Sequence, residues 1–253
     1  MSCVMAGCVR TMSHDSTATV RVSPDVPGPA AAVAPSGHRE VIGVSVLGRP
    51  IEIEYFGGGT PTVLVIGGIH GDEVASVDCT RGLIALLRAQ PNQVVNRTVA
   101  VIEVANPDGY ARRTRTNANG IDCNRNFPAR NFKPGGSRAY RAGTQPASEP
   151  ETRAILSAIA QLKPKLIISI HCIKGGRQQN NYDGPGEAIA TAMAAKNGYP
   201  VSANIGYPTP GSLGSYAGAD LQIPIITLEL PRDQPGAATW MQNRAALLTA
   251  VGW

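Results

Sequence analysis

Aromatic side chains are scarce in this sequence, at 5% of its 253 residues, and long apolar runs are missing. No stretch approaches the about 18 consecutive apolar residues of a membrane-spanning helix, so we expect no membrane partner. With few aromatics, the core has to be filled by Val, Ile, Leu and Ala. The hydrophobic fraction of 43% is ordinary for a globular protein, and the length suits one α/β domain with a tail.

Charge of one sign is not gathered into a stripe, although the formal net charge is +5. Arg is frequent between residues 112 and 141. We find no basic stripe interleaved with aromatic residues, which nucleic-acid-binding proteins typically carry. We therefore expect no nucleic-acid partner and assign these arginines to a local, substrate-directed role.

Paired cysteines are also missing, because the five Cys are odd in number and form no Cys-x-x-Cys motif. A reducing compartment is the simpler interpretation. The first residues contain no apolar run of signal-peptide length. We expect a cytoplasmic protein, unless a misassigned start codon hides an export signal.

The chain divides into a tail and one domain. Residues 1–37 are rich in Ser, Thr, Ala, Pro and Gly without periodicity, so we predict a disordered N-terminal tail there and one catalytic domain over 38–253. A hairpin is expected over 41–56, around the turn Leu47-Gly48-Arg49-Pro50. Buried strands rich in β-branched residues are expected at 62–68, 98–104, 165–170 and 224–230.

Helical patterns separate these strands. Helices are expected at 73–89, 149–162, 186–197 and 236–250. The second begins at Ser148-Glu149-Pro150-Glu151, which we interpret as a capping box with Pro in the first turn. The alternation predicts an α/β fold, with a mixed, mostly parallel twisted sheet and helices on both faces.

Two histidines and a glutamate follow buried strands. His70 and Glu73 lie at a Gly-rich turn after the first such strand, where open α/β sheets bind ligands. Taken alone, this pair is better explained as a polar turn with a capping residue. However, His171 directly follows another buried strand, while the remaining His14 and His38 lie near the N-terminus. Together His70, Glu73 and His171 form the His₂Glu set of a catalytic zinc site, so we predict one Zn²⁺ per chain.

Glu229 lies within an otherwise apolar strand, where a carboxylate is almost never buried without a partner. It either faces solvent on an edge strand or stands at the carboxyl end of a buried strand near the metal. In the second case it is the general base for a water that zinc makes acidic, and it later passes the proton to the leaving amine.

These pieces together resemble the M14 zinc metallocarboxypeptidase family, over roughly residues 40–250. The matching motifs stand in the family's order: HGDE at 70–73, NPDGY at 106–110, RTNANGIDCNRNFP at 115–128, SIH at 169–171 and TLEL at 227–230. The resemblance implies that His70, Glu73 and His171 bind zinc and that Glu229 is the catalytic glutamate.

The polar insert at 106–128 holds further matches. Read on its own it is a solvated basic loop or a carboxylate-binding segment, since Arg binds carboxylates in bidentate fashion. The resemblance implies that Arg115 polarises the scissile carbonyl and that Asn124 with Arg125 binds the free terminal carboxylate of a small peptide substrate. Tyr207 matches the tyrosine that closes over the substrate.

A narrower similarity covers residues 206–231 and the SEPET motif at 148–152, which are similar to murein peptide amidases of the bacterial cytoplasm. It implies cleavage of the γ-D-glutamyl–meso-diaminopimelate bond in recycled cell-wall tripeptide. Gly214 then falls at the base of the side-chain pocket, where it leaves room and supplies no charge. An uncharged base argues against Lys/Arg specificity, which uses an acid in the pocket.

Three alternatives remain open. The first is a general metallocarboxypeptidase with the same chemistry. The second is a deacylase like aspartoacylase or succinylglutamate desuccinylase, which shares an HxxE…H zinc set. The third is a catalytically inactive binding module, which loss of a ligand or of the glutamate would mark, and neither is lost here.

Overall fold

The structure is a computed structural model that describes residue 1 and residues 37–60, 62–174 and 176–253. The tail expected over residues 1–37 lies almost entirely outside the described residues. From residue 37 onward the described chain belongs to one compact unit.

One mixed sheet runs through this unit. Its strands, within the described residues, are β1 (Arg39–Val44), β2 (Pro50–Gly57), β3 (Thr62–Ile66), β4 (Thr98–Ile102), β5 (Leu166–Ile173), β6 (Gln179–Asp183), β7 (Val201–Ser202) and β8 (Ile225–Pro231). They lie in the order β1-β2-β4-β3-β5-β8-β6-β7. The central β4, β3, β5 and β8 are parallel neighbours, whereas β2 pairs antiparallel with β4, and β6 with β8. The predicted mixed sheet, mostly parallel at its centre, is confirmed.

The predicted strands form where the apolar runs indicated them. β3, β4 and β5 are buried at every position, as their runs of Val, Ile and Leu require. The expected hairpin forms from β1 and β2, and its turn holds Gly48 at φ 78°, a left-handed conformation that favours glycine. The sequence does not predict β6, because Gln-Asn-Asn-Tyr-Asp carries no apolar alternation.

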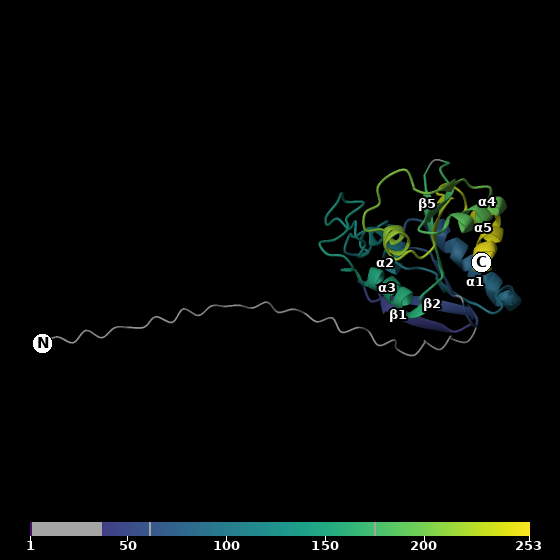
Figure 1. Cartoon of the computed structure of the whole chain (residues 1–253), viewed down its shortest axis with the longest axis horizontal. Coiled ribbons are helices and arrows are strands. Elements are labelled where there is room, and N and C mark those ends of the chain that lie inside the picture. Colours follow the sequence, from purple (N-terminus) through teal and green to yellow (C-terminus); the bar gives the residue numbers. More distant parts are fainter. Residues whose placement is uncertain (2–36, 61, 175) are drawn as a thin grey trace. The chain divides into compact units, whose positions relative to one another are not determined.

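Helices cover both faces of the sheet. The main helices are α1 (Val74–Ala89), α2 (Pro107–Arg112), α3 (Pro150–Leu162), α4 (Glu187–Asn197) and α5 (Gly236–Val251), with a π-helix, η3 (Gly214–Asp220). One core packs α1, α4 and α5 on one face, and a second core packs α3 and η3 on the other (Figure 1). The four predicted helices are therefore confirmed to within about one residue, and the short α2 is an addition.

The capping box predicted before α3 is wrong. Glu149 is the N-cap, and its side chain makes no capping hydrogen bond. Its carboxylate instead accepts hydrogen bonds from Asn117 at 2.7 Å and from Ser148 at 2.7 Å, and Glu151 accepts one from Asn117 at 2.9 Å. The two carboxylates of SEPET therefore hold the polar insert against α3, while Pro150 occupies the first turn as expected.

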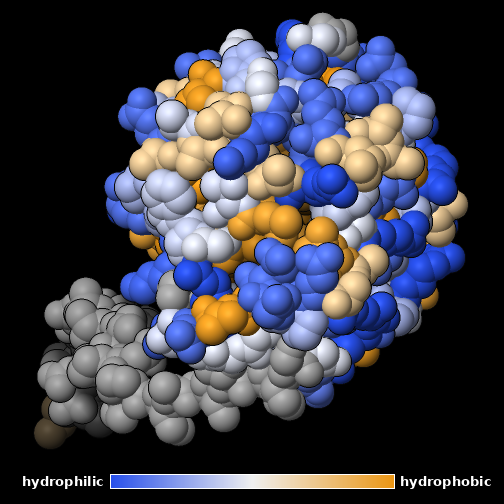
Figure 2. Space-filling view, turned by 90° about the vertical axis from the view of Figure 1, so that its right-hand side faces the viewer, coloured by the Kyte–Doolittle hydropathy of each residue, from blue (hydrophilic) through white to orange (hydrophobic). Residues whose placement is uncertain are grey.

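The surface of the α1 and α5 side is mainly hydrophilic. Figure 2 shows this face, on which hydrophobic residues lie in small groups among hydrophilic ones. Of the helices that the structure describes, none combines the length and the apolar character needed to cross a membrane.

Candidate active site

The loop after β3 carries His70 and Glu73, both of which are buried. Gly68 opens this loop at φ 64°, a left-handed backbone that favours glycine. Gly71 lies directly against the backbone of α2, since a Cβ there would come within 1.9 Å of the carbonyl carbon of Gly109. The loop and the polar insert are packed backbone to backbone, which fixes the direction of both side chains.

His171 lies inside β5, two residues before its end, and is buried. The sequence pattern places it directly after the strand, and that boundary is wrong. The strand continues because its last residues pair with β8, where His171 is the register partner of Glu229. A backbone ladder, and not a loop, therefore positions this histidine.

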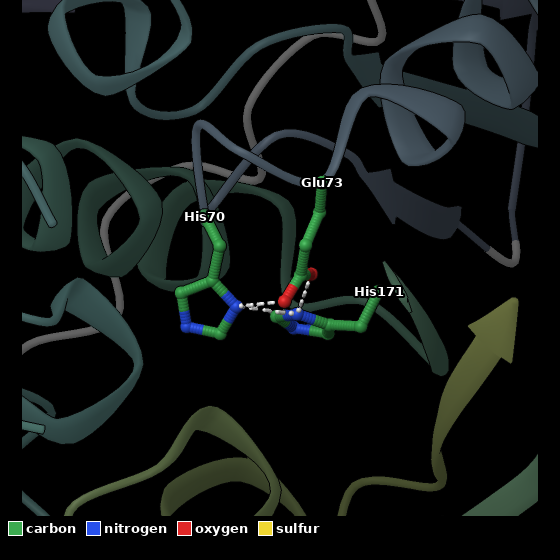
Figure 3. A group of neighbouring side chains, drawn as sticks. All are labelled: His70, Glu73 and His171. Carbon is green, nitrogen blue, oxygen red and sulfur yellow. Dashed lines mark hydrogen bonds and ion pairs between the residues drawn. The ribbon is translucent and has the colours of Figure 1, made fainter. Parts of the chain in front are cut away.

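These three side chains converge on one point (Figure 3). His70 Nδ1 lies 2.8 Å from Glu73 Oε1, and His171 Nδ1 lies 2.9 Å from Glu73 Oε2. The two Nδ1 atoms are 3.1 Å apart, and one ligand atom from each residue lies within 4.8 Å of the others. Two imidazole nitrogens and a carboxylate are the donor set that zinc prefers, so the residues present fit a zinc ion.

Glu73 is held in its ionised form. Burial would raise the pKa of its carboxyl group, yet the neighbouring His70 and His171 hold the pKa well below its usual value. Glu73 also accepts hydrogen bonds from the backbone N–H of Cys172 at 3.0 Å and from Arg115 at 3.3 Å. A metal ligand must be deprotonated and oriented, and Glu73 meets both conditions.

Asp122 is a further residue that contacts the His70 ring, and the sequence does not predict this contact. His70 Nε2 lies 3.0 Å from Asp122 Oδ1, and Arg115 Nε donates to Asp122 Oδ2 at 3.0 Å. Burial would raise the pKa of this carboxyl, but the attraction of His70 and Arg115 lowers it. A carboxylate behind a metal-binding histidine fixes which ring nitrogen faces the metal. Only its place inside the NGIDCNRN run signals it.

Glu229 faces the same pocket from β8. The alternative of a solvent-facing edge strand is wrong, because β8 lies between β5 and β6 and the side chain is 5% exposed. Burial, together with the charge of Glu73, raises the pKa of Glu229 to about 8. A carboxyl group with this pKa can take up and release a proton near neutral pH.

The polar insert brings two arginines and an asparagine to the pocket. Arg115, Asn124 and Arg125 all line it. Asn124 accepts a hydrogen bond from the Leu213 N–H at 2.9 Å, and Arg125 donates to the Asn124 carbonyl at 2.7 Å. Both guanidinium groups also lie over the Tyr140 ring, at 5.0 and 5.6 Å from its centre. Each arginine is thus held on one side and still lines the pocket.

Tyr207 also lines the pocket and is 43% exposed. It borders a second, wider cavity of about 700 Å³, which Arg125, Lys133, Tyr140 and Arg177 line as well. The zinc-site pocket and this cavity share Arg125 and Tyr207, so the tyrosine stands at the boundary between them.

Gly214 lines the pocket, but its surroundings differ from the expectation. The sequence predicts an open and uncharged pocket base at Gly214. The structure instead places Asp183 there, so close that a Cβ on Gly214 would lie 2.3 Å from Asp183 Oδ2. The missing side chain of Gly214 makes room for this carboxyl group, which β6 supplies and which also lines the pocket. The expected absence of charge is therefore wrong.

Comparison with known proteins identifies the family to which the chain is similar. The family model for zinc carboxypeptidase matches residues 34–184. The chain is 37% identical to murein peptide amidase A of Escherichia coli over 185 residues, which cover 66% of this chain and 70% of that protein. It is 31% identical to murein peptide amidase A of Vibrio campbellii over 237 residues, 88% of this chain and 89% of that one.

Solved structures show the same fold. The crystal structure of murein-tripeptide amidase MpaA from Escherichia coli superimposes with a TM-score of 0.70 at 30% identity, covering 88% of this chain and 94% of that chain. A carboxypeptidase A from Helicoverpa armigera shares the fold at 21% identity, with a TM-score of 0.68. The match covers 87% of this chain and 68% of that chain. The predicted zinc carboxypeptidase-like fold is confirmed.

Proposed function

Because the chain belongs to the zinc carboxypeptidase family and is a hydrolytic enzyme, we propose that it acts as a murein peptide amidase. The reaction is hydrolysis of the γ-D-glutamyl–meso-diaminopimelate bond of murein tripeptide, which releases the C-terminal diaminopimelate. The observation that carries this proposal is the similarity to murein peptide amidase A over 88% of the chain. The convergence of His70, Glu73, His171 and Glu229 in one pocket supports it.

One Zn²⁺ would be held by His70, Glu73 and His171, whose Nδ1 atoms and carboxylate lie next to one another. When bound, zinc supplies Lewis-acid chemistry, since it polarises a carbonyl group and makes water acidic. The Asp122 carboxylate behind His70 would keep the Nδ1 lone pair directed at the ion.

Glu229 would be the general base and then the general acid. It takes a proton from the attacking water and passes it to the departing amine of diaminopimelate. Two features support this role: the side chain lines the pocket beside the histidines, and its raised pKa lets it hold a proton between the two transfers. The backbone pairing of β8 with β5 keeps Glu229 at a fixed place relative to His171.

Two different anionic groups of the substrate would be bound, one by Arg115 and the other by Asn124 with Arg125. Arg115, which points to Glu73, is suited to the oxygen on which charge develops in the transition state. Asn124 and Arg125 are suited to the terminal carboxylate, with Arg as a bidentate donor. Tyr207, at the boundary of the pocket, would close over the bound peptide.

The location in the cell is part of the same proposal. Cys79, Cys123 and Cys172 are free and buried among the described residues. Free thiols fit a reducing compartment such as the cytoplasm, in which cell-wall peptides are recycled.

A direct test is to incubate the zinc-loaded enzyme with L-Ala-γ-D-Glu-meso-diaminopimelate and with a panel of ordinary peptides. Mass spectrometry should detect free diaminopimelate and the dipeptide, at a rate well above that for any ordinary peptide. Glu229→Gln, prepared in parallel, controls for a contaminating peptidase. Efficient cleavage of ordinary peptides alone would favour a general carboxypeptidase, and release of an acyl group from an N-acylated amino acid would favour a deacylase.

A further inference from the structure

The wide cavity beside the zinc-site pocket carries positive charge that the proposed reaction uses only in part. Lys133 and Arg177 line it together with Arg125, which would bind the terminal carboxylate. We propose that Lys133 and Arg177 bind the free α-carboxylate of the γ-linked D-glutamyl residue, on the acyl side of the scissile bond. This inference rests on the proposed function, because it concerns the part of the substrate that remains when the leaving residue departs. It makes the two cations specificity-determining for a γ-glutamyl bond.

Neither cation has an anionic partner in the part of the chain that the structure describes. The described residues that line the cavity include no Asp or Glu. The ion pairs of the described residues use other cations, and the printed hydrogen bond of the Arg177 side chain goes to the Lys174 backbone carbonyl, at 3.4 Å. Lys133 and Arg177 are exposed, so a ligand can reach both. The cavity therefore gathers positive charge and is suited to an anion.

Hydrogen bonds hold the walls of the cavity in place. One wall is a backbone loop in which the Ala142 N–H donates to the Gly135 carbonyl at 2.7 Å. A second wall comes from residues 207–210, and it ends at Gly211, whose N–H donates to Asn131 Oδ1 at 3.0 Å. Binding to a preformed site costs less ordering of the protein than binding to a loose one. The cavity is therefore built to receive a ligand without rearranging its backbone.

The cavity adjoins the place where the scissile carbonyl would lie. Arg125 and Tyr207 line both the cavity and the zinc-site pocket. Tyr140 lines the cavity, and the guanidinium group of Arg115 lies 5.0 Å from the centre of its ring. Because Arg115 is the residue assigned to the scissile carbonyl oxygen, the inner end of the cavity lies beside that carbonyl. A peptide whose leaving residue fills the pocket can thus extend its acyl part into the cavity.

A γ-glutamyl link places an anion close to the scissile bond on this acyl side. Two CH₂ groups and the α-carbon separate the scissile carbonyl from the α-carboxylate, a reach of about 5 Å. The other carboxylates of murein tripeptide belong to the leaving diaminopimelate, so this one needs a separate partner. Arg177 offers a fork that matches a carboxylate, and Lys133 offers a point charge. An α-linked peptide has a neutral amide in place of this carboxylate, so the two cations would favour the γ-linked substrate.

The test compares substrates that differ only in this carboxylate. One is L-Ala-γ-D-Glu-meso-diaminopimelate, and the other carries D-isoglutamine in place of D-Glu, so that an uncharged carboxamide of nearly the same shape replaces the α-carboxylate. The wild-type enzyme should prefer the acid by at least about tenfold in kcat/KM. The double variant Lys133→Gln with Arg177→Gln should lower kcat/KM for the acid by at least about tenfold and change that for the amide by less than about threefold.

A matched control separates local binding from the overall charge of the protein. Lys196→Gln removes a positive charge from an exposed position on α4 that does not line the cavity, and it should leave the preference for the acid unaltered. Retained hydrolysis of the amide substrate shows that the double variant is folded and holds its metal. Raising the salt concentration should reduce the wild-type preference, because salt screens the attraction between accessible charges.

The outcomes separate this inference from the proposed function. If both tripeptides are cleaved at one rate, or the preference for the acid survives in the double variant, the inference is overturned while the murein activity stands. If the tripeptides are inert but α-linked peptides with Asp or Glu before the leaving residue are cleaved faster than those with Asn or Gln, and the double variant removes that difference, the cavity binds a carboxylate but the murein activity falls. An enzyme that cleaves neither series overturns both.

Discussion

His171 and Glu229 stand opposite each other on neighbouring parallel strands, as register partners in the ladder between β5 and β8. One is a candidate metal ligand and the other the candidate base. Because hydrogen bonds of the sheet hold both backbones, their separation does not depend on the position of a loop.

Zinc binding should depend on His171. In His171→Ala the cluster keeps only His70 and Glu73, and two protein ligands hold zinc much more weakly than three. Metal analysis after gel filtration should find about one zinc per wild-type chain and far less in the variant. His38→Ala, which alters an exposed histidine, should keep the full zinc content. Full occupancy in His171→Ala would remove His171 from the ligand set.

Glu229→Gln should bind zinc and substrate yet lose turnover. The amide keeps the shape of the side chain but can no longer take a proton from water. We expect kcat to fall by at least the ~10²–10⁴-fold typical of general acid–base catalysis. Steady-state kinetics measures the change, and zinc content controls for loss of the metal. A kcat near that of the wild type would mean that another group is the base.

Arg115 and Arg125 should give different kinetic defects. Arg115→Ala should lower kcat by roughly ~10²–10³-fold, as on loss of an oxyanion donor, because charge develops on the carbonyl oxygen only in the transition state. Arg125→Ala should mainly raise KM, because the terminal carboxylate is charged throughout. Kinetics at equal zinc content would detect the difference, and identical profiles would refute the assignment.

Asp122→Asn should weaken metal binding without removing a ligand. His70 would lose the carboxylate that orients its ring, and such losses typically cost about 10–100-fold in metal affinity. Competition with a chromogenic chelator measures the affinity. Asp220→Asn, on the far end of η3, serves as the matched control. Unchanged affinity in Asp122→Asn would show that His70 keeps its orientation by other contacts.

Diaminopimelate should be preferred to lysine as the leaving residue by more than about tenfold in kcat/KM, or about 1.4 kcal/mol. Both residues carry the distal amine, so the difference must come from the distal carboxylate, which only diaminopimelate has. Competition between the two tripeptides in one reaction measures the ratio. Equal values would leave a general metallocarboxypeptidase.

Local patterns in the sequence predict most of the fold and the catalytic half of the site. The apolar runs of β3, β4, β5 and β8 and the periodicity of the four long helices mark their elements directly, because each pattern lies within about a dozen residues. The His70–Glu73 spacing and the two apolar runs that lead into His171 and Glu229 are equally local. These features are accessible without a structure.

The substrate-binding half depends on contacts that are distant in the chain. Asp183 ends a polar strand that pairs with β8, about forty residues further on. Asp122 is one acid in a polar loop, and only the fold sets it behind His70. No periodicity reports either contact, so the sequence alone predicts an uncharged pocket base at Gly214.

Because β8 pairs with β5 on one side and with β6 on the other, separate strands supply the two sides of the pocket. The ladder with β5 positions Glu229. Asp183 lies on β6, and its side chain packs against Gly214 and Gly218 of η3. Substitutions at residues 183 and 214 should therefore alter the wall of the pocket without moving the backbones that hold His171 and Glu229.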